Sequence, residues 1–227
     1  MSAALTSCAT TRQALVDAWG QTGARMPERT TAALQMVQAI AAGEGGNGAG
    51  CWGQCPGVCH NWGAVQLPHS PITSDGSAPN CPAGSAPCVD THPTSAGPVR
   101  YGVCFKTYAS QAAGAVDYLK TLVLRSNDTR IAVGSGNADL MAQAMYESHY
   151  YQGFSPDPAT AIATYAASIA RHAQSVALCM GEPVLVTRGL AATPDDLLVL
   201  TVAGIGLVFM TWAAWKEWGR PQRRRRT

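Results

Sequence analysis

The spacing of the cysteines constrains the fold of this chain more than any other feature of its sequence. Five of the eight cysteines fall between Cys51 and Cys88, inside residues 45–100, which are rich in Gly, Pro, Ser and Asn and have little periodicity. Irregular stretches of this length are usually functional or cross-linked. The even number of cysteines therefore predicts disulfides formed in an oxidising compartment, in pairings that the sequence leaves open. The eight are Cys8, Cys51, Cys55, Cys59, Cys81, Cys88, Cys104 and Cys179.

A metal site is the alternative explanation of the same cluster. Cys51, Cys55, Cys59 and His60 supply four soft ligands within ten residues. Zinc sites usually separate two closely spaced pairs by a longer arm, and three evenly spaced cysteines interrupted by Pro56 match that pattern poorly. The histidines also lack the H-E-x-x-H spacing of zinc peptidases. We therefore expect neither a metal nor a cofactor.

Outside this stretch, apolar residues recur at helical spacing. Leu34, Val37 and Ile40 mark the strongest helix, which the glycines from Gly43 onward end. The fold is therefore expected to be mainly α, with a Cys-, Gly- and Pro-rich irregular lobe. The expected helices cover residues 10–19, 28–42, 111–124, 138–151 and 158–178, and a short strand lies within residues 101–108.

The C-terminal segment has a different character. Residues 197–215 carry no formal charge, and at about 1.5 Å per residue a helix of this length spans roughly 28 Å, close to the hydrocarbon core of a bilayer. Thr193 and Pro194 favour a helix start, and Trp212, Trp215 and the arginines that follow fit a membrane interface. We therefore predict one C-terminal transmembrane helix, with a buried helix of the main domain as the alternative.

These boundaries divide the chain into five segments. Residues 1–29 form an N-terminal helical extension, 30–180 the main domain, 181–196 a linker, 197–215 the transmembrane helix and 216–227 a basic tail. The first twenty residues lack the basic start and continuous apolar run of a cleavable signal, so the main domain needs another route across a membrane, such as assembly of a membrane-containing virus particle.

The positive charge of the chain is confined to its tail. The residues from Lys216 onward carry six basic groups and one acid, a balance of +5, so the formal charge of +2 leaves −3 for everything before them. Recognition of nucleic acid usually needs a basic face on the folded part. No specific nucleic-acid binding by the main domain is therefore expected.

A single acid stands where the strongest helix ends. Glu44 lies between Gly43 and Gly45, and glycines let a large substrate approach closely. A carboxyl group at the end of an apolar helix can have its pKa raised enough to act as a general acid at neutral pH. Further motifs follow in order: NWGAVQ at residues 61–66, VCFKTY at 103–108, AQAMYESHYYQGF at 142–154 and AIATYA at 161–166.

In this order the motifs resemble the glucosaminidase and lysozyme-like wall hydrolases, including autolysin-type and flagellar-type N-acetylglucosaminidases. The resemblance covers about residues 30–176. It implies a lysozyme-like helical domain that cleaves the N-acetylglucosamine and N-acetylmuramic acid backbone of peptidoglycan. Glu44 would then be the proton donor to the glycosidic oxygen and Tyr150 a second catalytic group. The implied substrate-binding residues are Asn61, Trp62, Tyr146 and Tyr151, with core packing as the alternative for the aromatic ones.

The second carboxylate is a choice between two residues of the lobe, where the family often places its base or stabiliser. Asp90 is preferred as a catalytic residue, because Asp75 lies in an ordinary turn sequence between Ser74 and Gly76. If neither lies within reach of a sugar held by Glu44, nor does Glu147, a non-catalytic role gains support.

The sequence therefore predicts a membrane-anchored glycosidase acting on peptidoglycan, as an N-acetylglucosaminidase, a muramidase or a lytic transglycosylase, and in a virus as a virion-associated lysin. The expected partners are peptidoglycan glycan strands, the lipid bilayer through residues 197–215, and envelope or virion assembly partners. The main domain would face the wall, with the tail cytoplasmic or inside the virion. The alternative is a non-catalytic envelope or virion protein that retains the fold to bind glycan or to scaffold a membrane. A third interpretation assigns the function to the arginine tail, which would bind anionic lipid or packaged nucleic acid.

Overall fold

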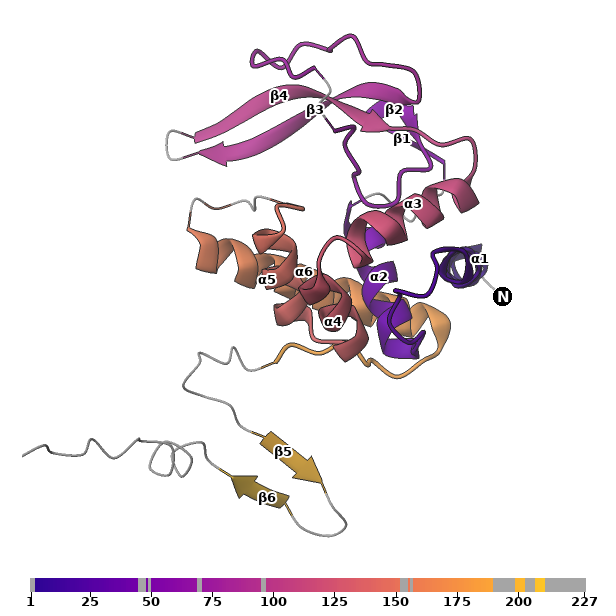
Figure 1. The fold of residues 1–227 in the computed structure, drawn as a ribbon, viewed down its shortest axis with the longest axis vertical. Helices are drawn as coiled ribbons and strands as arrows, with labels where there is room; N and C mark the ends of the chain where they lie inside the picture. The colour runs from indigo at the N-terminus through magenta and orange to yellow at the C-terminus, as the bar shows by residue number, and fades with distance from the viewer. Residues whose placement is uncertain are drawn as a thin grey trace, which may run out of the picture. The chain divides into compact units, whose positions relative to one another are not determined.

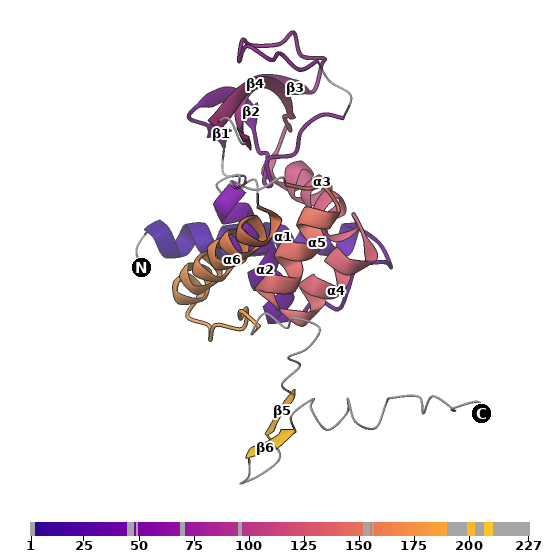
Figure 2. The ribbon, with the colours of Figure 1, turned by 90° about the vertical axis from the view of Figure 1, so that its left-hand side faces the viewer.

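The helix α2 (Thr31–Glu44) lies among the other helices of the computed structural model (Figures 1 and 2). Every residue from Ala33 to Ala41 is buried. A helix that is buried all round needs neighbours on several sides, and small or flexible side chains let those neighbours approach closely. The structure describes residues 3–44, 48, 50–68, 71–94, 97–151, 155, 157–189, 199–202 and 207–210.

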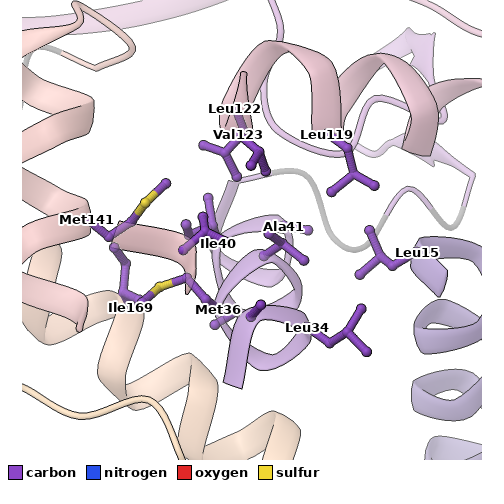
Figure 3. Close-up of a cluster of buried hydrophobic side chains, with 14 of the residues drawn as sticks. Leu15, Leu34, Met36, Ile40, Ala41, Leu119, Leu122, Val123, Met141 and Ile169 are labelled. Carbon is purple, nitrogen blue, oxygen red and sulfur yellow. The ribbon is translucent and has the colours of Figure 1, made fainter. Parts of the chain in front are cut away.

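Five further helices of the described residues pack with α2 or with one another in a single core. They are α1 (Ala3–Gln21), α3 (Gln111–Val123), α4 (Asn127–Ser135), α5 (Ala138–Glu147) and α6 (Pro158–Met180). Figure 3 shows side chains of four of these helices around α2: Leu15 of α1, Leu119 and Leu122 of α3, Met141 of α5 and Ile169 of α6. The prediction of a mainly α fold is confirmed.

Local signals in the sequence set the ends of α6. The carboxylate of Asp157 accepts a hydrogen bond from the Thr160 backbone N–H, and Pro158 occupies the first helical position. At the other end, Gly181 adopts a left-handed conformation with φ 66°, which glycine reaches without strain. These signals fix the length of the helix that carries Tyr165.

Two antiparallel hairpins form the lobe between α2 and α3 in the described residues. β1 (Cys51–Trp52) pairs with β2 (Cys55–Cys59), and β3 (Ser85–Thr94) pairs with β4 (Gly97–Lys106). In Figures 1 and 2 these strands lie on one side of the helices. Only β4 overlaps the expected strand, and the prediction of an otherwise irregular lobe is wrong for β1, β2 and β3. Pro87 and Pro93 within β3 hid its alternating pattern, because proline is unusual in strands.

Disulfides hold this lobe, whose buried apolar cluster is small. The cluster consists of Cys55, Val58, Ala86, Val103 and Phe105. The three disulfides of the lobe are Cys51–Cys59, Cys55–Cys88 and Cys81–Cys104. The prediction of disulfides is confirmed. The three cysteines of the alternative metal site form disulfides and therefore cannot act as thiolate ligands. Among the described residues, no group of three or more metal-ligating side chains occurs.

The fourth disulfide, Cys8–Cys179, ties α1 to α6. Beside it, the Arg12 guanidinium forms a bidentate ion pair with the Glu182 carboxylate, with a distance of 3.0 Å between Nη1 and Oε1. The same guanidinium donates a hydrogen bond to Oε1 of Gln38 in α2. Leu15 of α1 belongs to the main core. The segment expected as an N-terminal extension thus contributes to the helical core, and Met1–Arg188 forms one compact unit.

The second unit, Gly189–Thr227, contains two described strands. β5 (Val199–Val202) pairs with β6 (Leu207–Met210) in antiparallel fashion. The predicted transmembrane helix is therefore wrong for these residues, and the rest of residues 197–215 lies outside the described ones. Short apolar runs do not distinguish a helix from a strand, and β-branched residues such as Val199 and Thr201 favour strand pairing. Among the described residues, no helix is both long and apolar enough to cross a membrane.

The disulfides give a prediction about stability. Cys8–Cys179 closes a loop with a sequence separation of 171 residues, and Cys51–Cys59 one of 8. Chain entropy assigns about 5 kcal/mol to the first cross-link and about 2.5 kcal/mol to the second. In urea unfolding at pH 7, the Cys8→Ser/Cys179→Ser variant should lose about twice as much free energy of unfolding as Cys51→Ser/Cys59→Ser. Equal losses would contradict stabilisation through loop closure.

Candidate active site

Glu44 is the last residue of α2 and is partly buried at that helix end. Burial, the largest effect, raises the pKa of the Glu44 carboxyl group from its ordinary value of 4.5, and the negative charge of Asp90 raises it further. A hydrogen bond from Tyr165 opposes these effects but does not cancel them. The structure therefore gives Glu44 the property that a general acid needs, namely a proton retained to higher pH.

The residue that touches Glu44 directly is Tyr165 of α6, whose hydroxyl donates a hydrogen bond to Oε1. Burial, followed by the charge of Glu44, raises the pKa of Tyr165 far above its ordinary value, so the phenol keeps its proton and stays a donor. Because Oε1 accepts this bond, the acidic proton of Glu44 belongs on Oε2.

Two more tyrosines extend from Tyr165. The rings of Tyr165 and Tyr151 stack with centroids 4.0 Å apart and an interplanar angle of 20°, and Tyr146 meets Tyr151 edge-on at 5.8 Å. Tyr146 and Tyr151 are both partly buried. The structure thus brings the two tyrosines proposed for substrate binding into one cluster with the partner of Glu44.

Asp90 lies on β3, where it is partly buried. Its Oδ1 accepts a hydrogen bond from the Thr91 backbone N–H at 2.8 Å, and its Oδ2 accepts one from Nε2 of Gln66 at 2.9 Å. Asp90 is also the carboxylate whose charge raises the pKa of Glu44. The two acids preferred from sequence therefore interact electrostatically in the folded chain.

The other acids considered from sequence have different surroundings. Asp75 is exposed in a turn and accepts a hydrogen bond from the Ser77 backbone N–H, and bonding to Ser77 lowers the pKa of Asp75. Glu147 is exposed and accepts a hydrogen bond from Gln143. Neither arrangement resembles the buried surroundings of Glu44.

Tyr150 supports a loop of the site. Its hydroxyl donates to the carbonyl oxygen of Gly63 at 2.6 Å, and the Arg125 guanidinium lies 5.8 Å from its ring centroid. A side chain at position 63 would collide with the Tyr150 hydroxyl and the Tyr118 ring, so glycine is required for this close approach. The hydroxyl expected to act on the sugar is thus bonded to the protein backbone.

Asn61 and Trp62 need correction, since both were expected to bind substrate and both are completely buried. The Asn61 amide donates to the carbonyls of Val65 and Lys106 and accepts from the Val65 N–H. Trp62 stacks on Tyr118 at 6.2 Å and donates its indole N–H to the Gln111 carbonyl oxygen at 3.0 Å. These side chains hold the segment that follows β2 against β4 and α3. The core-packing alternative is correct for Trp62.

A charged group also anchors the point where β4 leads into α3. The Asp117 carboxylate accepts hydrogen bonds from Nζ of Lys106 at 2.8 Å and from the Tyr108 hydroxyl at 2.5 Å. Although burial opposes it, the bonding to Lys106 and Tyr108 lowers the pKa of Asp117 overall. The ion pair fastens the end of the β3–β4 hairpin to the helical part of the molecule.

Comparison with known proteins gives similarity at the level of structure. No protein-family model matches the chain, and no curated protein matches it. A peptidoglycan hydrolase mutant from Sphingomonas sp. A1 is 20% identical, with a TM-score of 0.47, over 74% of this chain and 98% of that one. The catalytic domain of the autolysin Auto from Listeria monocytogenes is 13% identical, with a TM-score of 0.48, over 80% and 88%. A glycoside hydrolase domain of FlgJ from Salmonella typhimurium is 18% identical, with a TM-score of 0.42, over 77% and 98%.

The hydrogen bond from Tyr165 predicts the effect of its removal. Tyr165→Phe keeps the ring on Tyr151 but deletes the donor that stabilises ionised Glu44, so the pKa of Glu44 should rise further. Carbon-13 NMR titration of the glutamate carboxyl signals measures this shift, with Tyr108→Phe, which removes a hydroxyl bonded to Asp117, as the control. A lower pKa of Glu44 in Tyr165→Phe would contradict the arrangement.

The raised pKa of Glu44 also predicts a pH dependence of stability. The folded chain binds the Glu44 proton more tightly than the unfolded chain, so this contribution is fully present below pH 4.5 and is lost as the pH rises through the raised value. Glu44→Gln does not titrate there. The variant should therefore gain stability relative to the parent from pH 4.5 upward, measured as the difference in Tm; a difference that stays constant with pH would refute the assignment.

Proposed function

We propose that the chain is a glycosidase that cleaves the glycan backbone of peptidoglycan, with Glu44 as the proton donor. The observation that carries this proposal is the state of Glu44, a partly buried carboxyl group whose pKa is raised by burial and by the charge of Asp90. Breaking a glycosidic bond requires protonation of the leaving oxygen and stabilisation of an oxocarbenium-like sugar. Glu44 and Asp90 supply an acid and a negative charge for these two tasks.

In the proposed reaction, Glu44 donates a proton and Asp90 stabilises positive charge. Tyr165 occupies Oε1 of Glu44, so Oε2 delivers the proton to the glycosidic oxygen, which leaves as a hydroxyl group with the pair of electrons of the broken bond. The positive charge that develops on the sugar is stabilised by Asp90. Water, deprotonated with the help of a carboxylate, then adds to the sugar. The faces of Tyr151 and Tyr146 offer apolar surface of the kind that sugar rings pack on.

The second carboxylate distinguishes this proposal from a non-catalytic, glycan-binding or membrane-scaffolding protein. Such a protein has no use for a carboxyl group with a raised pKa, and the negative charge of Asp90, which adds to the rise at Glu44, favours the enzyme. The four disulfides fit a wall-facing, oxidising compartment. Attachment to a membrane and a place in a virion remain predictions.

The proposal is tested with the full chain on purified peptidoglycan, by loss of turbidity and by mass spectrometry of the released muropeptides. Glu44→Gln should lower the rate at least about 100-fold, because proton transfer to the leaving group is lost. Glu28→Gln, the same change at an exposed position, should act like the parent. No cleavage by a folded parent chain would sink the proposal.

Asp90→Asn separates two versions of the reaction. If Asp90 assists the attack of water, the variant should lose hydrolysis. Products with an anhydro sugar end, formed by the parent and by Asp90→Asn alike, would instead assign the chain to the lytic transglycosylases, which share the same acid.

A further inference from the structure

Gln66 links a loop to the second carboxylate of the site. Its Nε2 donates a hydrogen bond to Oδ2 of Asp90 at 2.9 Å, across 24 residues of sequence. The Thr91 N–H bonds Oδ1, so each oxygen of the carboxylate accepts an N–H. The Thr91 bond comes from the adjacent residue and moves with Asp90. Gln66 therefore relates Asp90 to a segment 24 residues away in the sequence.

The position of Gln66 is set by the backbone. Residues 65–67 run along β4, where the Lys106 N–H donates to the Val65 carbonyl oxygen at 2.9 Å and the Leu67 N–H to the Cys104 carbonyl oxygen at 2.8 Å. Gln66 pairs with Phe105 in an antiparallel bridge. β3, which carries Asp90, lies along the other edge of β4. The Gln66 side chain thus reaches across β4 to Asp90.

This loop is the one whose buried residues Asn61 and Trp62 anchor it to β4 and to α3. Asp90, by contrast, lies four residues from the end of a long two-stranded hairpin. A hairpin of two strands is only marginally rigid by itself. The disulfide Cys55–Cys88 ties β3 two residues before Asp90, and the bond from Gln66 connects the carboxylate beyond that cross-link to a segment fixed in the core.

We propose that Gln66 is a positioning residue that holds the Asp90 carboxylate toward Glu44. This inference rests on the proposed function and deepens it. An amide suits the task because it donates a hydrogen bond without adding charge, whereas a cation at this place would neutralise Asp90.

The titration of Glu44 reports on this arrangement without requiring catalysis. The groups that act on Glu44 or sense its charge come from several elements: Tyr165 on α6, Tyr118 on α3, Tyr150 and Tyr151 after α5, and Asp90 on β3. The four phenols have raised pKa values and stay neutral. Asp90 contributes a carboxylate to this set and raises the pKa of Glu44, so a change in its position should change the pKa of Glu44.

The experiment measures the Glu44 carboxyl titration by carbon-13 NMR in the full chain. Asp90→Asn should lower the pKa of Glu44 by removing a nearby negative charge. Gln66→Ala should shift it in the same direction and by no more than Asp90→Asn. Adding Gln66→Ala to Asp90→Asn should cause no further shift. The control is Gln13→Glu, since Gln13 is an exposed glutamine that likewise donates to a carboxylate, that of Asp17 at 2.8 Å.

Cleavage kinetics on soluble glycan strands form the second arm. Gln66→Ala should lower kcat about 10-fold with little change in KM, as expected for a misplaced catalytic group. Gln66→Glu, nearly the same in shape, should lower kcat more because its carboxylate repels Asp90. In the Asp90→Asn background, Gln66→Ala should have no further effect on kcat.

Two results would overturn the proposal. One is a folded Gln66→Ala variant whose Glu44 titrates as in the parent. The other is additivity of Gln66→Ala and Asp90→Asn, which would make Gln66 a separate contact to substrate. If the parent chain cleaves nothing, the proposed function fails, and the NMR arm still decides whether Gln66 positions Asp90.

Discussion

The burial of α2 between Ala33 and Ala41 places the acid of the site. A helix packed on several sides cannot turn or slide without exposing apolar surface or opening voids, and each methylene group exposed to water costs about 0.8 kcal/mol. The hydroxyl of Tyr118 adds a hydrogen bond to the Val37 carbonyl oxygen at 2.6 Å, and Gln35 binds the backbone of Pro183 and Leu185. The packing of the core therefore sets the position of Glu44, which is the last residue of this helix.

Asp90 is placed by a different kind of interaction. The lobe has too few buried apolar residues to order a long hairpin by packing alone, and cross-links and polar bonds take over. Cys88, two residues before Asp90, is bonded to Cys55 of β2, and Gln66 bonds Asp90 itself. The site therefore combines a core-fixed acid with a carboxylate that depends on a disulfide and an amide. Loss of either should affect Asp90 before it affects Glu44.

The sequence predicted what depends on local patterns. Apolar spacing predicted the helical core, and the even number of cysteines predicted the disulfides. The position of Glu44 at a helix end predicted its raised pKa. The strands of the lobe were missed because prolines and cysteines conceal their alternation. Trp62 was expected to bind substrate but is buried, because the sequence N-W-G does not show whether its tryptophan packs in a core or lines a binding site. Tyr165 was part of the AIATYA motif but received no role, because its partner Glu44 lies 121 residues away and a local pattern does not show which distant residues meet.

The chemistry of the donors explains why the two carboxylates can differ in role. A hydrogen bond from a neutral phenol or amide orients a carboxylate with only a modest effect on its protonation, whereas an adjacent cation would strongly favour the ionised form. Two cations of neighbouring elements have partners of their own: Lys106 pairs with Asp117, and Arg125 bonds the carbonyl oxygens of Ser148 and His149. Burial and the charge of Asp90 favour the protonated form of Glu44, and together they outweigh the hydrogen bond from Tyr165, which favours the ionised form. For the proposed acid catalysis at Glu44, the pairing of these cations with other groups matters as much as the placement of Glu44 itself.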